Sequence, residues 1–462
     1  MAFKIDDLLN TNSTPSQVQL NYLRNVILQL DEDISGTNEQ ILAMQAKFLV
    51  LRTRRTQLVQ QRRCYSNLLS PVRCLPIEIF GQIFVYATCD HPRHVLDLSA
   101  VCQLWRYAAL STPMLWSTLE LGHHTKRYNT DNHINSWIER ARSYPLSLII
   151  RKRKGFLDPV KSALTLIANH QWKSITLDSD NRGISSILEK LELSNLEMLE
   201  SFSLGPRFDS NLTYPDALRY APKLKTLSLN IIPRHPVTLD TLPFPWGQLT
   251  NLTVTFLDKR MDTLRACVNL EELVITGGRD VDGSNDSITL NYLRKLHIRC
   301  SDKMFLLSLK TPSIQDFSMR IIPPNYSSDL DFYDYIEKNG STLLKLSISP
   351  YHTGSRLVKC IPYLRSLVEF KLYDDDDDDG YQSSWMDEIL SSLVVNPEMD
   401  PSTIPLPRLE VLEIMCEVTK DNERMFMKVI DSRDWPDGEE NARQKQGQRS
   451  LSRIKYSFLR LI

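Results

Sequence analysis

The side chains best suited to chemistry in this chain are five histidines and one run of aspartates. His91 and His94 stand three residues apart, and His123, His124 and His133 follow in one polar segment. Imidazole nitrogens bind zinc, but structural zinc sites usually add cysteine ligands, and no cysteine pair accompanies these histidines. The sequence therefore favours solvated loop histidines over a zinc site.

Six consecutive aspartates, Asp374 to Asp379, form the strongest charge run in the chain. Calcium-binding loops interleave acidic ligands with glycine and end in a glutamate at a set distance. This run has neither feature, and a run of like charge is usually a solvated loop. We expect a mobile acidic loop near 374–380 and no metal.

Motifs that carry catalysis are missing from the sequence. It contains no Gly-x-Ser-x-Gly, no Gly-x-x-x-x-Gly-Lys-Ser/Thr, no Gly-x-Gly-x-x-Gly and no His-Glu-x-x-His. Gly277-Gly278 leads into a polar turn rather than a phosphate-binding loop, and the basic run 151–154 fits a solvated strand end as well as a nuclear import signal. We expect no cofactor and no enzymatic activity, because nothing positive supports a hydrolase or a transferase.

Composition narrows the class of protein further. The 462 residues carry a net charge of −1, which argues against binding nucleic acid or anionic membranes through bulk charge. No run of about twenty apolar residues predicts a membrane span, and the first residues do not resemble a secretory signal. Eight cysteines are scattered without a Cys-x-x-Cys pair, which is typical of reduced thiols in the cytoplasm or nucleus.

Three short apolar segments follow one another between Leu75 and Leu119. Leu75-Pro76 opens the first, and proline suits the first helical position because its missing N–H needs no partner there. The apolar residues of the first two segments recur at helical spacing, and a third cluster follows Thr112-Pro113. Three helices this small bury too little surface for a stable core. Part of their apolar surface should therefore face the rest of the chain or a partner.

The order of these residues resembles the F-box, a helical module that binds the Skp-type adaptor of cullin–RING ubiquitin ligases. The matching residues are Leu75-Pro76, Glu78-Ile79, Ile83-Phe84, Leu98, Val101-Cys102, Trp105-Arg106, Pro113 and Leu115-Trp116. An ordinary three-helix packing unit is the alternative. The resemblance implies adaptor-facing residues Leu75, Pro76, Ile79, Ile83, Leu98, Val101, Cys102, Trp105, Leu115 and Trp116. Some of these must form the module's own core, and the sequence does not divide the two groups.

A heptad pattern precedes this module. Fifteen positions from Leu20 to Leu69 alternate in spacing between three and four residues, and twelve of them are apolar. Such a seam belongs to a coiled coil or to a long helix lying on another helix, and Ser35-Gly36-Thr37 could break it into a helical hairpin. The seam residues are Leu20, Leu23, Ile27, Leu30, Ile34, Thr37, Ile41, Met44, Phe48, Leu51, Arg55, Leu58, Arg62, Tyr65 and Leu69. The two arginines argue against a dry, tight dimer in the second half, so self-association through 20–69 stays open.

From Trp172 onward the pattern apolar-x-x-apolar-x-apolar occurs ten times, mostly 21–29 residues apart. Residues two apart share one face of a strand, so the last two of each unit should point into a core. The units are Trp172/Ile175/Leu177, Leu199/Phe202/Leu204, Leu224/Leu227/Leu229, Leu249/Leu252/Val254, Leu270/Leu273/Ile275, Leu293/Leu296/Ile298, Ile314/Phe317/Met319, Leu343/Leu346/Ile348, Leu367/Phe370/Leu372 and Leu409/Leu412/Ile414. The solvent-facing positions between them would include Ser228, Thr253, Val274, His297, Ser318, Ser347, Lys371 and Glu413.

The period and the front half of the pattern resemble leucine-rich repeats, with chance leucine spacing in an α/β protein as the alternative. Such units cannot bury their apolar faces alone, so they stack into a solenoid. The asparagine or cysteine that the family places three residues after the strand is replaced by Ile232, Gly278, Ser301 and Glu417. We therefore expect an irregular arc.

Together these patterns predict an α+β chain that ends in an irregular α/β leucine-rich-repeat solenoid. The predicted parts are a flexible N-terminus (1–15), a heptad helix or helical hairpin (16–70), a three-helix F-box-like domain (71–121) and the solenoid (122–462). Within the solenoid, 145–150 should be a strand, 431–449 a polar loop and 451–462 a closing strand or cap.

This order of parts resembles F-box substrate-recognition proteins, most of all the large F-box families of mushroom-forming fungi. The resemblance implies a non-catalytic adaptor in the cytoplasm or nucleus, without nucleic-acid or membrane partners. The F-box would dock on the Skp-type adaptor and its cullin ligase core, while the repeats hold an unknown protein substrate close to the ligase. The alternative is a repeat scaffold outside any ligase, whose three helices cap the solenoid and whose heptad helix drives self-association.

Overall fold

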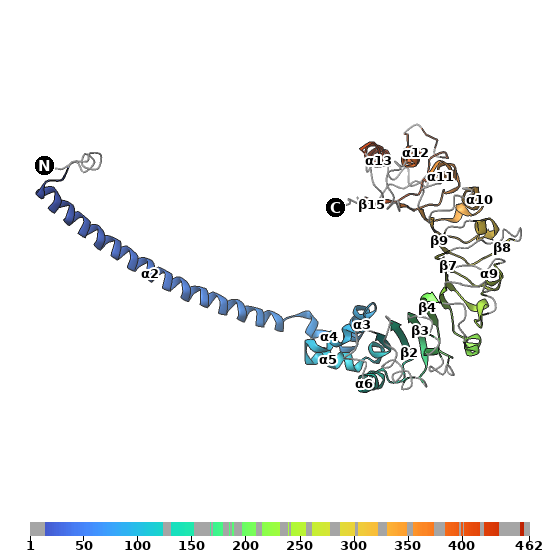
Figure 1. Ribbon diagram of the computed structural model, residues 1–462, viewed down its shortest axis with the longest axis horizontal. Helices are drawn as coiled ribbons and strands as arrows, with labels where there is room; N and C mark the ends of the chain where they lie inside the picture. Colours follow the sequence, from blue (N-terminus) through green and yellow to red (C-terminus); the bar gives the residue numbers. More distant parts are fainter. Residues whose placement is uncertain are drawn as a thin grey trace. The chain divides into compact units, whose positions relative to one another are not determined.

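The computed structural model (Figure 1) divides the chain into two compact units, 1–80 and 81–462. The structure describes residues 14–122, 131–151, 167, 170–178, 184, 187–188, 196–208, 215–231, 239, 242–255, 261–277, 287–300, 304–321, 330–348, 354–373, 384–396, 399–400, 402–415, 420–433 and 453–456. The chain mixes helix and strand, with a long N-terminal helix followed by a parallel-sheet region, as the sequence predicted. The border between the units falls inside the predicted domain 71–121, within helix α3 (Ile77–Thr88).

The first unit consists mainly of helix α2 (Gln17–Leu68), followed by the short turn η1 (Pro71–Cys74). The Ser16 N–H donates to Oε1 of Gln19 at 2.8 Å, which satisfies a donor at the start of α2. The helix runs unbroken through Ser35-Gly36-Thr37, so the hairpin alternative is wrong. The Thr37 hydroxyl donates to the Asp33 carbonyl one turn earlier at 2.8 Å, so helical geometry leaves no polar group unpaired there.

The second unit opens with the rest of α3, α4 (His94–Val101), α5 (Gln103–Ser111) and η2 (Pro113–Trp116). Phe84 of α3 is buried, and its ring lies 5.1 Å from that of Trp105 on α5. Glycine at position 81 permits this close packing, because a Cβ there would lie 2.6 Å from Oγ1 of Thr112. The predicted helices thus pack on one another through small and aromatic residues.

The rest of this unit is built on one parallel sheet whose strands follow sequence order. Its thirteen described strands are β1 (Thr118–Gly122), β2 (Leu146–Arg151), β3 (Trp172–Asp178), β4 (Ser201–Phe208), β5 (Thr226–Ile231), β6 (Asn251–Val254), β7 (Glu272–Ile275), β9 (Lys295–Cys300), β11 (Asp316–Ile321), β12 (Lys345–Ile348), β13 (Glu369–Tyr373), β14 (Val411–Met415) and β15 (Arg453–Tyr456). Two further strands, β8 (Ile288–Thr289) and β10 (Leu309–Lys310), pair separately. The strand predicted at 145–150 is confirmed as β2, which begins one residue later, and residues 453–456 of the predicted closing segment 451–462 form strand β15.

Each of the ten predicted repeats forms a strand of this sheet, and its three apolar residues are buried. The middle residues of the ten units lie in one row across the sheet, each in register with its neighbours. That row is Ile175, Phe202, Leu227, Leu252, Leu273, Leu296, Phe317, Leu346, Phe370 and Leu412. Because side chains alternate along a strand, a constant register keeps one face of the sheet apolar along its whole length.

Short helices connect the strands, and α9 to α13 lie along one side of the sheet (Figure 1). The connecting helices in the described part of the chain are α6 (Asp131–Ala141), η4 (Asp216–Tyr220), η6 (Trp246–Gln248), α9 (Asp262–Ala266), η7 (Met304–Ser308), α10 (Leu330–Asn339), η8 (Gly340–Thr342), α11 (Gly354–Cys360), η9 (Ile361–Tyr363), α12 (Ser384–Leu393) and α13 (Lys420–Arg433). Several buried apolar residues of these helices, such as Phe332 and Ile389, add to the core.

Two predicted limits differ from the structure. Residues 118–121, assigned to the three-helix domain, form strand β1 of the sheet, because their alternating apolar residues Leu119 and Leu121 are buried beside β2. Residues 431–433, assigned to a polar loop, form the last turn of α13. The remainder of that loop and the aspartate run 374–379 lie outside the described residues.

No single described helix has the length and hydropathy of a membrane span, although α2 with η1 and α3 pass that test jointly across a bend.

Candidate protein-interaction site

Helix α3 has two faces of opposite accessibility, although both are apolar. Phe80 and Phe84, four residues apart, are buried, whereas Ile79, Ile83 and Tyr86 lie at i, i+4 and i+7 on a second face. Ile83 keeps 46% of its surface exposed. The two phenylalanines and the two isoleucines carry the apolar pattern at helical spacing in the first segment, and the structure separates Phe80 and Phe84 in the core from Ile79 and Ile83 on the surface.

Helices α4 and α5 repeat this division. Val95, Ala108 and Ala109 are buried, while Val101 at the end of α4 is 60% exposed. On α5 the exposed apolar residues are Leu104, Tyr107 and Leu110. Nε of Arg106 donates to the Ser99 carbonyl at 3.0 Å, which ties α5 to α4 across the extended residue Cys102.

The ten residues that the F-box resemblance singled out fall into three groups. Pro76, Ile79, Ile83, Val101 and Cys102 are exposed, and Leu75, Leu98 and Trp105 are half-buried. Leu115 and Trp116 are buried in the second unit. Leu115 and Trp116 are therefore not accessible to a partner, whereas each of the other eight side chains keeps accessible surface.

Trp116 is held in the core by several contacts. Its Nε1 donates to the Ala109 carbonyl at 2.8 Å, and the ring of Trp137 packs edge-on against it at 4.8 Å. The guanidinium carbon of Arg140 lies 4.5 Å from the centre of the Trp116 ring, a cation–π contact. These contacts join η2 to α6, so Trp116 acts in the structure as an anchor for the first strands of the sheet.

The structure adds exposed apolar residues that the motif did not mark. Tyr86, Leu104, Tyr107, Leu110 and Met114 all have large exposed surfaces. Three of them, Leu104, Tyr107 and Leu110, recur every three residues along α5, and that spacing was visible in the sequence. A concentration of exposed apolar side chains on a few helices is typical of surfaces that bind other proteins, which makes these helices a candidate site.

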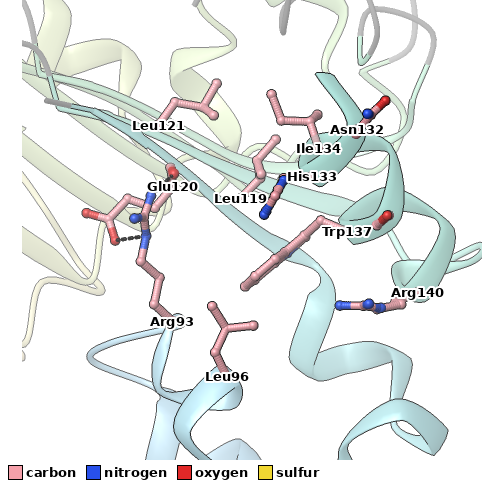
Figure 2. Close-up of a pocket in the computed structure, with 11 residues that line it drawn as sticks. Arg93, Leu96, Leu119, Glu120, Leu121, Asn132, His133, Ile134, Trp137 and Arg140 are labelled. Atoms are coloured by element: carbon pink, nitrogen blue, oxygen red, sulfur yellow. Dashed lines mark hydrogen bonds and ion pairs between the residues drawn. The ribbon is translucent and has the colours of Figure 1, made fainter. Parts of the chain in front are cut away.

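A separate pocket of about 420 Å³ lies between the start of α4, strand β1 and helix α6 (Figure 2). Leu96, Leu119, Ile134 and Trp137 give it apolar walls, and an Arg93–Glu120 pair closes one edge. Nε of Arg93 lies 3.8 Å from Oε2 of Glu120, and Nη2 of Arg93 donates to the Glu120 carbonyl at 2.6 Å. The described lining is suited to holding an apolar group and presents no cysteine or aspartate.

The sheet face that lies away from the buried residues forms a second candidate surface. The eight solvent-facing positions predicted from the repeats lie in a single register row, from Ser228 on β5 to Glu413 on β14. The residues two positions earlier on each strand form a second register row on the same face. On β2 to β6 these two rows hold serine, threonine and asparagine with one isoleucine, Ile149. From β7 onward they hold mostly charged residues and serine.

The charged part of this face is neutralised internally. Nζ of Lys371 lies 2.7 Å from Glu369 and 3.2 Å from Glu413, and Nζ of Lys345 lies 2.8 Å from Glu369. Partial burial acts to raise the pKa of Glu369, but the hydrogen bonds from Lys345 and Lys371 and their charges lower it overall. The hydrogen bond to Glu369 raises the pKa of Lys371, which stays charged at neutral pH. The face is thus polar without a strong net charge.

Among the described residues, no three His, Cys, Asp or Glu side chains are placed to hold a metal ion. His91 and His94 lie with ring centres 5.0 Å apart, and His123 and His124 fall outside the described part of the chain.

Gly277 lies where a Cβ would come within 2.5 Å of the Thr255 carbonyl oxygen. The missing Cβ of Gly277 therefore allows the turns that contain Thr255 and Gly277 to approach each other closely.

No family model matches this sequence, and no curated protein shows significant similarity to it. The resemblance to F-box proteins and to leucine-rich repeats therefore rests on the residues and on the arrangement of elements described above.

Proposed function

We propose that this chain is an F-box substrate-recognition adaptor of a Skp–cullin–F-box ubiquitin ligase. The observation that carries the proposal is the set of exposed apolar residues on α3, α4 and α5. The resemblance places adaptor contacts at Ile83 and Val101, and both side chains are exposed, whereas Phe84 is buried. Apolar anchors on a small helical unit are typical of hot spots in protein interfaces.

The parallel sheet would serve as the substrate-binding part, as an irregular leucine-rich-repeat solenoid. Its support is the sequential order of the strands and the constant register of the buried row. Each strand pairs with its neighbours in sequence, which is how stacked repeats build a continuous core. The face that runs from Ser228 to Glu413 would hold the protein to be ubiquitylated, and ligase chemistry would take place on other subunits.

The test is a binding titration of the full-length chain with a purified Skp-type adaptor. Ile83→Asp and Val101→Asp should each weaken binding at least about thirtyfold, because either change places a charge in an apolar interface. Val268→Asp is the matched control, since Val268 is 58% exposed at a distant turn after α9. It should change affinity less than about threefold, within the range of contacts outside a hot spot.

Absence of binding by the folded wild-type chain would overturn the proposal, and so would equal affinity of wild type and both variants. The alternative, a scaffold outside any ligase, would then remain. It draws on one observation of its own, which is that no residue of helix α2 is buried.

A further inference from the structure

Helix α2 carries the apolar seam that the heptad pattern predicted from Leu20 to Tyr65, and this seam is half-buried at Leu20 and Leu23 and exposed from Ile27 onward. None of its 52 residues is buried, and Ile41 and Leu51 keep 47% and 60% of their surfaces exposed. In proteins, most of the stability of a helix comes from packing its apolar face against other residues, and a helix without such packing has little stability. A seam of this length therefore needs a partner helix.

Charge divides α2 into two unlike halves. Residues 17–42 contain four acidic residues and one arginine, whereas residues 43–68 contain six basic residues and no acidic one. A parallel pair would place the two basic halves side by side. An antiparallel pair would place each basic half against an acidic half, so the charge pattern favours a second copy in the opposite direction.

The seam itself fits this direction in a single register. If Ile41 faces Met44 of the other copy, the numbers of facing seam residues add up to 85, those of facing residues beside the seam add up to 83 or 87, and Gln17 lies opposite Leu68. The two helices then overlap from end to end. The facing pairs are Leu20–Tyr65, Leu23–Arg62, Ile27–Leu58, Leu30–Arg55, Ile34–Leu51, Thr37–Phe48 and Ile41–Met44.

This register also resolves the two arginines that argued against a tight dimer. Arg55 and Arg62 each face a leucine, over which a long arginine stem can lie while its charged end reaches water. In a parallel pair Arg55 would face Arg55 and Arg62 would face Arg62. The large Phe48 meets the small Thr37, which fits close packing in a seam.

The positions beside the seam give the strongest contrast between the two directions. In the antiparallel register Asp31 faces Arg52 of the other copy, and Asp33 faces Arg54. The twofold axis repeats each pair, which makes four ion pairs and no facing like charges at these positions. In a parallel pair Lys47 would face Arg52, a repulsion that occurs twice, and neither aspartate would face a basic residue.

We propose that α2 joins two copies of this chain as an antiparallel coiled coil in which Asp31 pairs with Arg52 and Asp33 pairs with Arg54. The scaffold alternative already includes self-association through the heptad helix. The present proposal adds the relative direction of the two helices and their register. It does not depend on adaptor binding, because its residues lie on α2 alone. In an adaptor it would hold two substrate-binding sheets in one complex.

The test measures the dimer dissociation constant of the full-length chain by sedimentation. Arg52→Asp should raise the constant about tenfold, because two attractive pairs with Asp31 become two repulsive ones. Asp31→Arg should act likewise, and the double variant should return to within about threefold of wild type. A parallel dimer predicts the opposite sign for Arg52→Asp, since this change would relieve its repulsion with Lys47.

Glu32→Arg and Arg63→Asp are the matched controls, because they reverse the same charges on positions away from the seam. Each should leave the constant within about threefold of wild type. Ile41→Asp should abolish the dimer while the sheet stays folded.

A monomeric wild type at every concentration measured would overturn the proposal. Tighter association of Arg52→Asp, no recovery in the double variant, or a dimer that survives Ile41→Asp would also overturn it. The adaptor titration on these variants separates the two proposals, because a chain that fails to bind the adaptor can still show the charge-swap pattern.

Discussion

Arg433 is a charged side chain in the core of the second unit, and its contacts are backbone carbonyls. Nε and Nη2 donate to the Leu393 carbonyl, Nη2 to the Pro405 carbonyl and Nη1 to the Leu406 carbonyl, at 2.7–3.2 Å. Burial lowers the pKa of Arg433 to about 10, so the side chain remains charged at neutral pH. It ties the end of α13 to the end of α12 and to the turn before β14.

Arg433→Met should lower the free energy of opening around α12 and β14 by about 3–5 kcal/mol, because buried carbonyls lose their donors. Hydrogen exchange on these elements measures the change. Lys428→Met, at an exposed position of the same helix, should alter it by less than about 0.5 kcal/mol. Equal protection from hydrogen exchange in the two variants would show that water replaces the guanidinium with no loss of opening free energy.

At the residue scale, the sequence identified apolar positions but could not assign each to core or surface. Leu115-Trp116 and Val101-Cys102 belong to the same motif, yet the first pair is buried and the second is exposed. Burial depends on α6 and on strand β1, whose residues pack on η2 from outside the motif. Arg433 was missed for a similar reason, because an arginine in a polar stretch gives no sign of the carbonyls it will meet.

Glu369 on β13 forms ion pairs with Lys345 on β12 and with Lys371, two residues later on its own strand. Because its pKa is lower in the folded chain than its ordinary value, it contributes stability that is present above pH 4.5. This contribution disappears as pH falls through the lower, folded pKa. The pKa of Lys371 is raised in the folded chain, so its contribution to stability is present at neutral pH and is lost only when pH rises through that raised pKa.

Glu369→Gln should therefore lower the stability of strands β12 to β14 by about 1 kcal/mol near neutral pH. The difference from wild type should shrink as pH falls below about 4.5 and vanish in acid. Hydrogen exchange at several pH values measures it. Glu272→Gln is the control, because the Glu272 ion pair with Lys295 is longer, at 3.7 Å, and its effect should be smaller. A difference that persists in acid would assign the loss to packing.

At the scale of elements, strands were easier to predict from the sequence than helices. The period of two residues and the repeat spacing located ten strands and their exposed row, because register must keep one face apolar along the whole sheet. Strand β1 was missed, since only Leu119 and Leu121 alternate there and the sequence pattern assigned them to the preceding three-helix domain. The continuity of α2 was ambiguous, because Gly36 lowers helix propensity but contacts nothing that would enforce a bend.

At the scale of the whole molecule, the sheet joins residues that are far apart in sequence only through intervening strands. Every described strand of the large sheet pairs with its neighbours in chain order. Stability in such an arrangement is close to a sum of local terms and nearest-neighbour terms. The sequence could predict this order from a regular period, but the lengths of the connecting helices vary too much to predict the curvature of the sheet.

A cavity in the middle of the sheet should therefore have a local effect. Leu296 is fully buried on β9 between β7 and β11, and Leu296→Ala should lower the opening free energy of these strands by about 3 kcal/mol. Amides of β2 to β4 should keep their protection in hydrogen exchange, because no strand pairing connects them directly to β9. Ile175→Ala is the mirror control, and it should weaken β2 to β4 while it leaves β9 unchanged. If either substitution lowers protection uniformly from β2 to β14, the sheet unfolds as one cooperative unit, and the nearest-neighbour description fails.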